Sequence, residues 1–272
     1  MPPYVWWILA GCGLLLVAVA VYLFMIKPGP RRDLRAYGTK FAHRGLWDEQ
    51  SPENSLAAMK KAVDAGYGIE FDIHLTRDGQ VVVFHDDTLI RMCGVEGRVE
   101  DKTYAELCEL RLLDSDQKIP LLTELLEVVD GRVPLLVELK GESGNTSLCP
   151  VADAILSAYK GPYIIESFNP LLVRWYRKNR PDVIRGQLFC NLNNGRRVKK
   201  LIYFLITALL TNVLARPHFL ARGQDSAKNL SFVICRKLFR APSYVWTIRA
   251  PEEAPDPARG EGIIFERFIP KE

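Results

Sequence analysis

Short apolar stretches with strand-like alternation recur from residue 40 to residue 265, and segments with helical spacing separate most of them. The Asp78-Gly79 step is typical of a tight hairpin turn, so we interpret Gln80–His85 as an antiparallel return outside the main sheet. The other predicted strands are Lys40–Arg44, Gly68–Leu75, Val133–Lys140, Tyr163–Phe168, Val183–Phe189, Pro217–Ala221, Tyr244–Arg249 and Gly262–Phe265. Eight strands that alternate with helices predict an α/β fold, a closed (β/α)8 TIM barrel with its active site at the carboxyl ends of the strands.

Capping and helix-breaking residues between the strands indicate where helices begin and end. Asn54 is expected to cap a helix that begins at Ser55 and stops at Gly66. Leu121–Val129 has the spacing of another helix, and Asp87–Pro120 is interpreted as a small insertion of turns and short helix after the hairpin. Prolines at 251, 255 and 257 predict that no helix forms before the last strand.

The N-terminal segment Tyr4–Ile26 carries no charged residue. As a helix it would measure about 34 Å, enough to cross the hydrocarbon core of a bilayer. Trp6 and Trp7 near one end and Tyr22 near the other resemble interfacial aromatic belts. A cleaved signal peptide and a buried core helix are the alternatives. We therefore expect an anchor and linker at 1–39, with Pro28–Thr39 as the linker, and a barrel at 40–272.

Charge then suggests an orientation for this anchor. Lys27, Arg31, Arg32 and Arg35 follow the apolar segment, which predicts a single-pass cell-membrane protein with its barrel in the cytoplasm. The six cysteines lack metal-site spacing and fit free thiols in a reducing compartment. A net charge of +4 is too small to indicate nucleic-acid binding.

Charged residues gather where the barrel would place an active site. Glu70 and Asp72 share one face of a strand, and Glu138 ends the next one, which suits a divalent ion such as Mg²⁺ or Ca²⁺. Arg44 and Lys140 could complete a cationic cradle for a phosphate. His43 and His85 could act as acid and base on opposite sides of the phosphorus. A metal-free salt-bridge network and structural histidines are the alternatives.

Several neighbours of these residues allow two roles. Glu53 either pairs locally or joins the metal ligands, and Asn54 either caps its helix or contributes to the site. His74 is expected to pack behind the site, while Asp86 and Asp87 orient His85 or cap a turn. Trp246 either floors the substrate pocket or fills the barrel.

The order of these motifs resembles the glycerophosphodiester phosphodiesterase family. The resemblance runs from residue 40 to about residue 249 and rests on His-Arg-Gly 43–45, Pro-Glu-Asn 52–54, Glu-Phe-Asp 70–72, Thr-Arg-Asp-Gly 76–79, His-Asp 85–86, Glu-Leu-Lys 138–140, Ser-Phe 167–168 and Trp-Thr 246–247. It implies a TIM-barrel hydrolase of lipid and glycerol metabolism that cleaves glycerophosphodiesters to glycerol 3-phosphate and an alcohol.

The resemblance also implies residue roles. Those matching His43 and His85 form the acid/base pair, those matching Glu70, Asp72 and Glu138 bind the metal, and those matching Arg44 and Lys140 hold the phosphate. It allows a route in which a glycerol hydroxyl attacks first and water opens a cyclic phosphate. The last strand, Gly262–Phe265 followed by Glu-Arg-Phe, departs from the family's usual Thr-Asp and Pro.

One more segment bears on the identity of the substrate. Arg196, Arg197, Lys199 and Lys200 precede Leu201–Leu214, which we expect to be one apolar helix of about four turns. It is either a barrel helix or an amphipathic helix on an anionic membrane surface. A lysophospholipase D and a non-catalytic phosphodiester or lipid sensor are therefore the competing functions. The head group, the preferred ion and the oligomeric state stay open.

Overall fold

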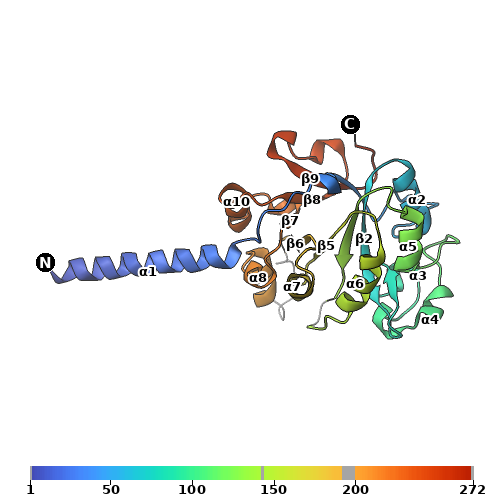
Figure 1. Ribbon diagram of the computed structural model, residues 1–272, viewed down its shortest axis with the longest axis horizontal. Helices are drawn as coiled ribbons and strands as arrows, with labels where there is room; N and C mark the ends of the chain where they lie inside the picture. Colours follow the sequence, from blue (N-terminus) through green and yellow to red (C-terminus); the bar gives the residue numbers. More distant parts are fainter. Residues whose placement is uncertain (1, 142–143, 192–199, 271–272) are drawn as a thin grey trace.

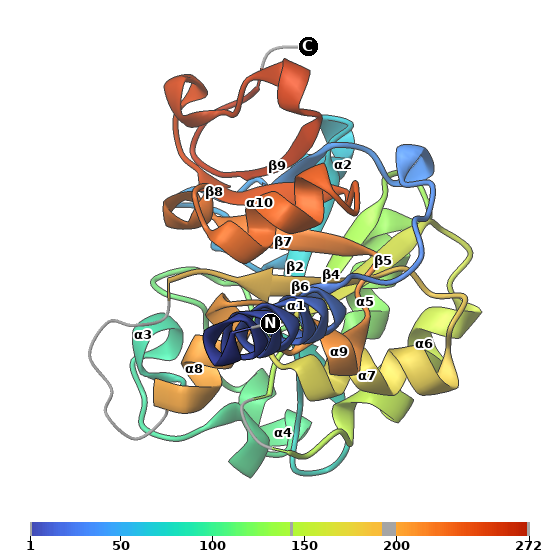
Figure 2. The same ribbon diagram turned by 90° about the vertical axis from the view of Figure 1, so that its left-hand side faces the viewer.

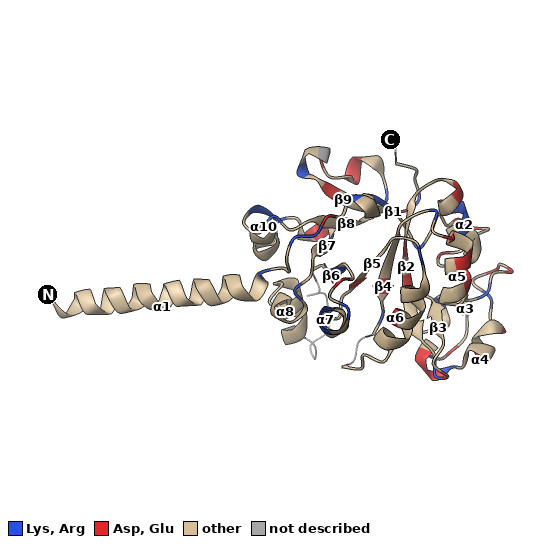
Figure 3. Cartoon of the chain, in the orientation of Figure 1, with Lys and Arg blue, Asp and Glu red and all other residues tan. Residues whose placement is uncertain are grey.

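The computed structural model of the protein describes residues 2–141, 144–191 and 200–270. A long straight helix, α1 (Pro3–Ile26), projects from a rounded barrel (Figure 1). It is long and apolar enough to cross a membrane, by length and composition. Lys and Arg residues begin only where it meets the barrel (Figure 3).

Eight parallel strands close the barrel. Their order around the ring is β1-β9-β8-β7-β6-β5-β4-β2, and β1 pairs with β2 to complete it. The strands are β1 (Lys40–His43), β2 (Gly68–Leu75), β4 (Leu135–Leu139), β5 (Tyr163–Ser167), β6 (Arg185–Phe189), β7 (Phe219–Gly223), β8 (Ser243–Ile248) and β9 (Glu261–Phe265). All eight predicted strands are confirmed, although β4, β6 and β7 each start two residues later than expected.

A ninth strand, β3 (Val81–Val83), forms the predicted hairpin. It runs antiparallel to the end of β2, with Leu75 opposite Val81. Gly79 adopts the left-handed backbone (φ 79°) that a tight turn requires. The amide of Phe84 donates to the carbonyl of Asp72 at 2.9 Å, so the chain returns beside the strand that carries the acidic pair.

Helices cover the outside of the barrel (Figure 2). The longer ones are α2 (Leu56–Asp64), α5 (Leu122–Val129), α6 (Leu148–Ala158), α7 (Pro170–Asn179), α8 (Lys200–Thr207) and α10 (Leu230–Lys237). The shorter ones are α3 (Ile90–Cys93), α4 (Tyr104–Cys108), α9 (Asn212–Ala215), η1 (Arg35–Tyr37), η2 (Val99–Asp101), η4 (Gln224–Ser226), η5 (Pro251–Glu253) and η6 (Pro257–Arg259). Only the 3-10 turns η5 and η6 are seen between β8 and β9, as the prolines predict.

The alternation along β2 separates the core from the site. Ile69, Phe71 and Ile73 are fully buried and pack outward in the cluster shared with α2 and α5. Glu70 and Asp72 alternate with them and therefore face the barrel interior. Burial of the apolar set against helices thus fixes the acidic pair inside the barrel.

The expected cap at Asn54 is wrong by one residue. Ser55 is the N-cap of α2, and its hydroxyl accepts from the amide of Ala58 at 3.1 Å. Asn54 instead has a left-handed backbone (φ 60°), which turns its side chain away from the helix. In this conformation the side-chain amide of Asn54 reaches the barrel interior, where it donates to Asp72.

The single helix expected over Leu201–Leu214 is also wrong. α8 ends at Thr207, whose carbonyl accepts from Asn229 Nδ2 at 2.8 Å instead of continuing the helix. The buried Leu209 has a positive φ (55°), and α9 follows separately. Of the four cations before this segment, Arg196, Arg197 and Lys199 lie outside the described residues.

Candidate active site

Strand register brings the inward-facing charges together. His43 of β1 lies opposite Glu70 of β2, and Asp72 of β2 lies opposite Glu138 of β4. Residues opposite each other in parallel strands share a face of the sheet. Three strands therefore aim these side chains at one end of the barrel interior, as the sequence predicted.

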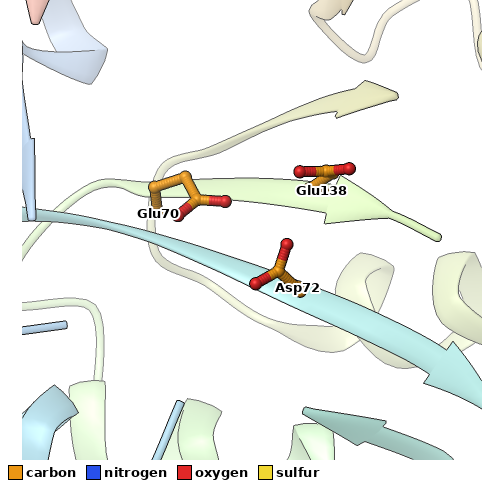
Figure 4. A group of neighbouring side chains, drawn as sticks. All are labelled: Glu70, Asp72 and Glu138. Carbon is orange, nitrogen blue, oxygen red and sulfur yellow. The ribbon is translucent and has the colours of Figure 1, made fainter. Parts of the chain in front are cut away.

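The acidic residues form a candidate metal centre. One oxygen from each of Glu70, Asp72 and Glu138 lies within 4.8 Å of the others, and the three side chains converge (Figure 4). All three are at most 8% exposed. Burial and the neighbouring carboxylates raise the pKa of Glu70 well above its ordinary value. Burial also raises the pKa of Glu138, against the opposing effect of Lys140. Such excess buried negative charge is relieved by a cation.

Two basic side chains flank this centre. Lys140 Nζ lies 2.8 Å from Asp72 and 2.7 Å from Glu138, and these carboxylates raise its pKa despite burial. Arg44 Nε lies 3.5 Å from Asp72, and its Nη1 donates to Glu53 at 2.7 Å. Burial alone would raise the pKa of Asp72, but Lys140 and the other nearby cations hold it well below its ordinary value. Asp72 is thus the most firmly ionised member of the acidic set.

His43 stands on one side of the centre with its imidazole held by an acid. Its Nδ1 lies 2.6 Å from Glu266 Oε2, just past the end of β9, and its Nε2 lies 3.9 Å from Glu70. Burial lowers the pKa of His43, while the bond to Glu266 opposes that effect. A carboxylate on Nδ1 sets the ring orientation and leaves Nε2 toward the site.

His85 follows the hairpin and is held in the same manner. Its Nδ1 lies 2.5 Å from Asp86, which also accepts from Arg91 Nε at 2.6 Å. His74 Nε2 contacts the backbone carbonyl of His85 at 3.3 Å, which fits the expected packing role behind the site. The side chain of Asp87 lies 3.9 Å from Arg98, and it is Asp86 that contacts the His85 ring, so Asp86 is the orienting residue.

The two ambiguous residues before α2 have distinct contacts. Asn54 Nδ2 donates to Asp72 at 2.8 Å, so Asn54 belongs to the site. Glu53 accepts from Arg44 and from Arg91, the latter at 2.6 Å, and so links Arg44 to the insertion. Burial would raise the pKa of Glu53, but these arginines lower it. Glu53 therefore pairs with these two arginines and is separate from the three converging carboxylates.

A cavity of about 440 Å³ opens beside these groups. It is lined on the polar side by His85, Glu138 and Lys140, and on the apolar side by Phe168, Ile202, Tyr203 and Ile206. Trp246 is half-buried and packs edge-to-face on Phe168 with ring centroids 5.6 Å apart. Trp246 thus contacts a residue of the cavity wall but does not itself line this cavity.

Sequence reasoning missed two buried acids. Glu266 directly follows the last strand, and its position one residue past a barrel strand was the available signal. Glu166 lies opposite Glu138 in the β4–β5 ladder, is 1% exposed, and has an Oε2 without a hydrogen-bond partner among the described residues. Burial and the neighbouring Glu138 raise its pKa well above the ordinary value. Strand register places Glu166 beside the three converging carboxylates.

Comparison with known proteins gives a consistent result. The model of the group described as "Glycerophosphoryl diester phosphodiesterase family" matches residues 43–254. A glycerophosphodiester phosphodiesterase of Caldanaerobacter subterraneus is 36% identical over 56% of this chain and 67% of its own length. A lysophospholipase D of Rattus norvegicus is 27% identical over 71% and 68% of the two chains. Alignments with the first four relatives span between 38% and 67% of their lengths.

The fold is also similar to solved structures. A phosphodiesterase of Oleispira antarctica, solved with the product sn-glycerol-3-phosphate, superposes with a TM-score of 0.69. The alignment covers 85% of this chain and 93% of the other at 24% identity. At that identity the likeness establishes the barrel fold.

Proposed function

The chain belongs to the glycerophosphoryl diester phosphodiesterase family, and from this premise we propose that it hydrolyses glycerophosphodiesters to glycerol 3-phosphate and an alcohol. The observation that carries the proposal is the convergence of three carboxylates, two cations and two carboxylate-held histidines at one end of the barrel. A phosphodiester is a tetrahedral anion, and this set supplies positive charge and proton transfer around it.

The donor set fits a divalent cation. Glu70, Asp72 and Glu138 would hold it through oxygen, the ligand type that Mg²⁺ and Ca²⁺ prefer. The raised pKa values of Glu70 and Glu138 support this assignment, because they reflect carboxylates with too little compensating positive charge. When bound, the ion would polarise the phosphoryl oxygens.

His43 and His85 are proposed as the acid/base pair. Each has a carboxylate on Nδ1, which leaves Nε2 of each ring for the substrate. One ring would take the proton of the attacking hydroxyl, and the other would give a proton to the leaving alcohol oxygen. Arg44 and Lys140 would hold the phosphate between them through charge-assisted hydrogen bonds.

A second candidate substrate is a lysophospholipid. The apolar wall of the cavity, with Phe168, Ile202 and Ile206, favours an alcohol that carries an acyl chain. Relatives named lysophospholipase D support the same class of phosphodiester.

The anchor is the remaining part of the proposal. We expect α1 to hold the barrel at the cell membrane as a single-pass helix with the barrel in the cytoplasm, since Lys27, Arg31 and Arg32 follow it. A cytoplasm-active reporter fused to the C-terminus should be active. Activity of alkaline phosphatase at that position instead would contradict the orientation.

The test is a panel of substrates and metals. The purified full chain is assayed on glycerophosphocholine, glycerophosphoethanolamine and lysophosphatidylcholine, with Mg²⁺, Ca²⁺ or EDTA. We expect turnover that EDTA abolishes and one of the two ions restores. Turnover that persists in EDTA would contradict the metal assignment, and binding of these compounds without turnover would favour a sensor.

The histidines are tested in the same assay. His43→Ala and His85→Ala should each lower turnover by about 10² or more. His74→Ala is the matched control within the site region, because the His74 ring contacts the backbone carbonyl of His85 and not its imidazole. Near-normal rates in both catalytic variants would reject the two-histidine mechanism.

A further inference from the structure

The end of α1 is fixed to the barrel by specific hydrogen bonds. Tyr22 lies 2.8 Å from Ser231 of α10, and Asn212 Nδ2 donates to the carbonyl of Ile26 at 2.8 Å. Arg216 Nη1 donates to the carbonyls of Phe24 and Lys27 at 2.9 and 2.6 Å. Because α10, α9 and the C-cap residue of α9 hold the helix end, the direction of α1 determines which side of the barrel faces a bilayer that α1 enters.

That side of the barrel carries exposed apolar residues. In both ribbon views α8 and α10 lie close to the end of α1 (Figures 1 and 2). On α8, Leu201 is 72% exposed, Ile202 50% and Phe204 54%, and Leu230 at the start of α10 is 67% exposed. Large apolar residues of this kind, gathered on one side, indicate a contact with another apolar phase.

Basic residues lie among them. Lys27 and Arg177 are exposed, and Arg216 is half-buried at the junction of α1 and α9. Arg177 donates to the carbonyls of Val213 and Leu214, which holds it on the same side as α9. Apolar residues flanked by cations match the surface of a bilayer that contains anionic lipid.

The same helix is also a wall of the active-site cavity. Ile202, Tyr203 and Ile206 line the cavity together with His85 and Lys140, whereas Leu201 and Phe204 do not line it. One face of α8 therefore meets the site and another is open to the outside.

We propose that α8 lies in the headgroup region of an anionic bilayer beside α1 and forms the membrane-side rim of the active site. A substrate with an acyl chain then enters laterally from the bilayer, with the chain along Ile202 and Ile206 and the phosphodiester toward Lys140. The kinetic consequence rests on the proposed phosphodiesterase activity, but the placement of α8 does not.

Placement is measured without using activity. The full chain is prepared as Phe204→Cys and, separately, as Leu113→Cys. In both, the exposed and partly exposed cysteines Cys12, Cys93, Cys108 and Cys190 are replaced by alanine, so that an environment-sensitive fluorophore labels the introduced thiol. Leu113 is a matched control: it is 53% exposed and its amide donates to Met92 of α3, on the side of the barrel away from α1 (Figure 1). Each protein is reconstituted in phosphatidylcholine vesicles with phosphatidylglycerol, with nitroxide-labelled lipid as quencher.

The label at position 204 should be quenched by the lipid nitroxide and the label at position 113 should not. Equal quenching at the two positions would overturn the proposal. Protection of position 204 from aqueous quenchers without lipid quenching would also overturn it, and would indicate a second copy of the chain or another protein on α8.

Activity provides the second measurement. Leu201→Glu with Phe204→Glu should raise KM for lysophosphatidylcholine presented in vesicles several-fold while leaving kcat/KM for soluble glycerophosphocholine unchanged. The soluble substrate reports that the variant is folded. An equal loss on both substrates, or no change on either, would contradict lateral entry. If the wild-type chain cleaves neither substrate, the proposed function fails while the quenching result still decides the placement of α8.

Discussion

Glu266→Gln is the most informative single substitution, because sequence reasoning overlooked this residue. Glu266 is 6% exposed and pairs with His43 and with Arg249, both through contacts of 2.6–2.7 Å. Burial would raise its pKa, but these two partners lower the pKa to about 2 from an ordinary value of 4.5. A difference of about 2.5 units corresponds to about 3.4 kcal/mol at about 1.36 kcal/mol per unit.

The expected loss of stability is smaller than that figure. The side chain of Arg249 is 55% exposed, so water screens part of its interaction. Glutamine also keeps a neutral hydrogen-bond acceptor near His43. We therefore expect a loss of about 1–2 kcal/mol at neutral pH, or about 2–8 °C in the Tm of a domain of this size.

The pH dependence has a definite sign. The pKa of Glu266 is lower in the folded than in the unfolded chain, so its stabilisation is complete above about pH 4.5 and lost as the pH falls toward 2. The difference in Tm between the wild type and Glu266→Gln should therefore be largest near neutral pH and shrink below about pH 4.5. Thermal unfolding of the full chain in detergent, followed by circular dichroism at several pH values, measures it.

Glu127→Gln on the exposed face of α5 is the matched control and should leave Tm unchanged. In the assay, Glu266→Gln should lower kcat by about 10-fold to 10²-fold with little effect on KM, since the His43 ring loses the carboxylate that orients it. A Tm difference that is absent at neutral pH, or that stays constant down to about pH 3, would refute this account of Glu266.

Three other substitutions test neighbouring parts of the site. Ser55→Ala should lower the free energy of unfolding by about 1 kcal/mol and leave kcat unchanged, because Ser55 caps α2. Asn54→Ala should lower kcat, because the Asn54 amide donates to Asp72 at 2.8 Å. Equal kinetics of Ser55→Ala and Asn54→Ala on glycerophosphocholine would argue against a site role for Asn54. Glu138→Gln should raise the metal concentration for half-maximal activity by about tenfold or more, with Glu127→Gln as control, and an unchanged metal titration would remove Glu138 from the ligand set.

Much of the site was predictable because it is local to strands. Alternation along β2 sets Glu70 and Asp72 on one face whatever the rest of the chain does, and the Asp78-Gly79 turn returns His85 to the same strand. The residues missed or misassigned depend on contacts that are distant in sequence. His43 and Glu266 are 223 residues apart, and only closure of the barrel through the β1–β9 pairing makes them neighbours.

The two errors in helices have the same origin. Helix-capping preference does not distinguish Asn54 from Ser55. The side-chain amide of Asn54 donates to Asp72 inside the barrel, so Ser55 caps the helix instead. Apolar composition favoured a single helix that spans Leu201–Leu214. The side chain of Asn229 donates to the carbonyl of Thr207, and α8 ends there. Local propensity is a weak prior when a buried polar contact competes with it.

The sequence by itself determined the barrel, the apolar N-terminal helix and the chemical character of the site, because strand alternation, hairpin chemistry and residue type are local properties. Tertiary structure decided which acids hold the histidines and that Glu166 stands beside Glu138. It also decided that Ile206 of α8 both lines the cavity and packs in one apolar cluster with Ile26 at the end of α1. These features arise from strand register, barrel closure and side-chain contacts between distant segments, which no local pattern encodes.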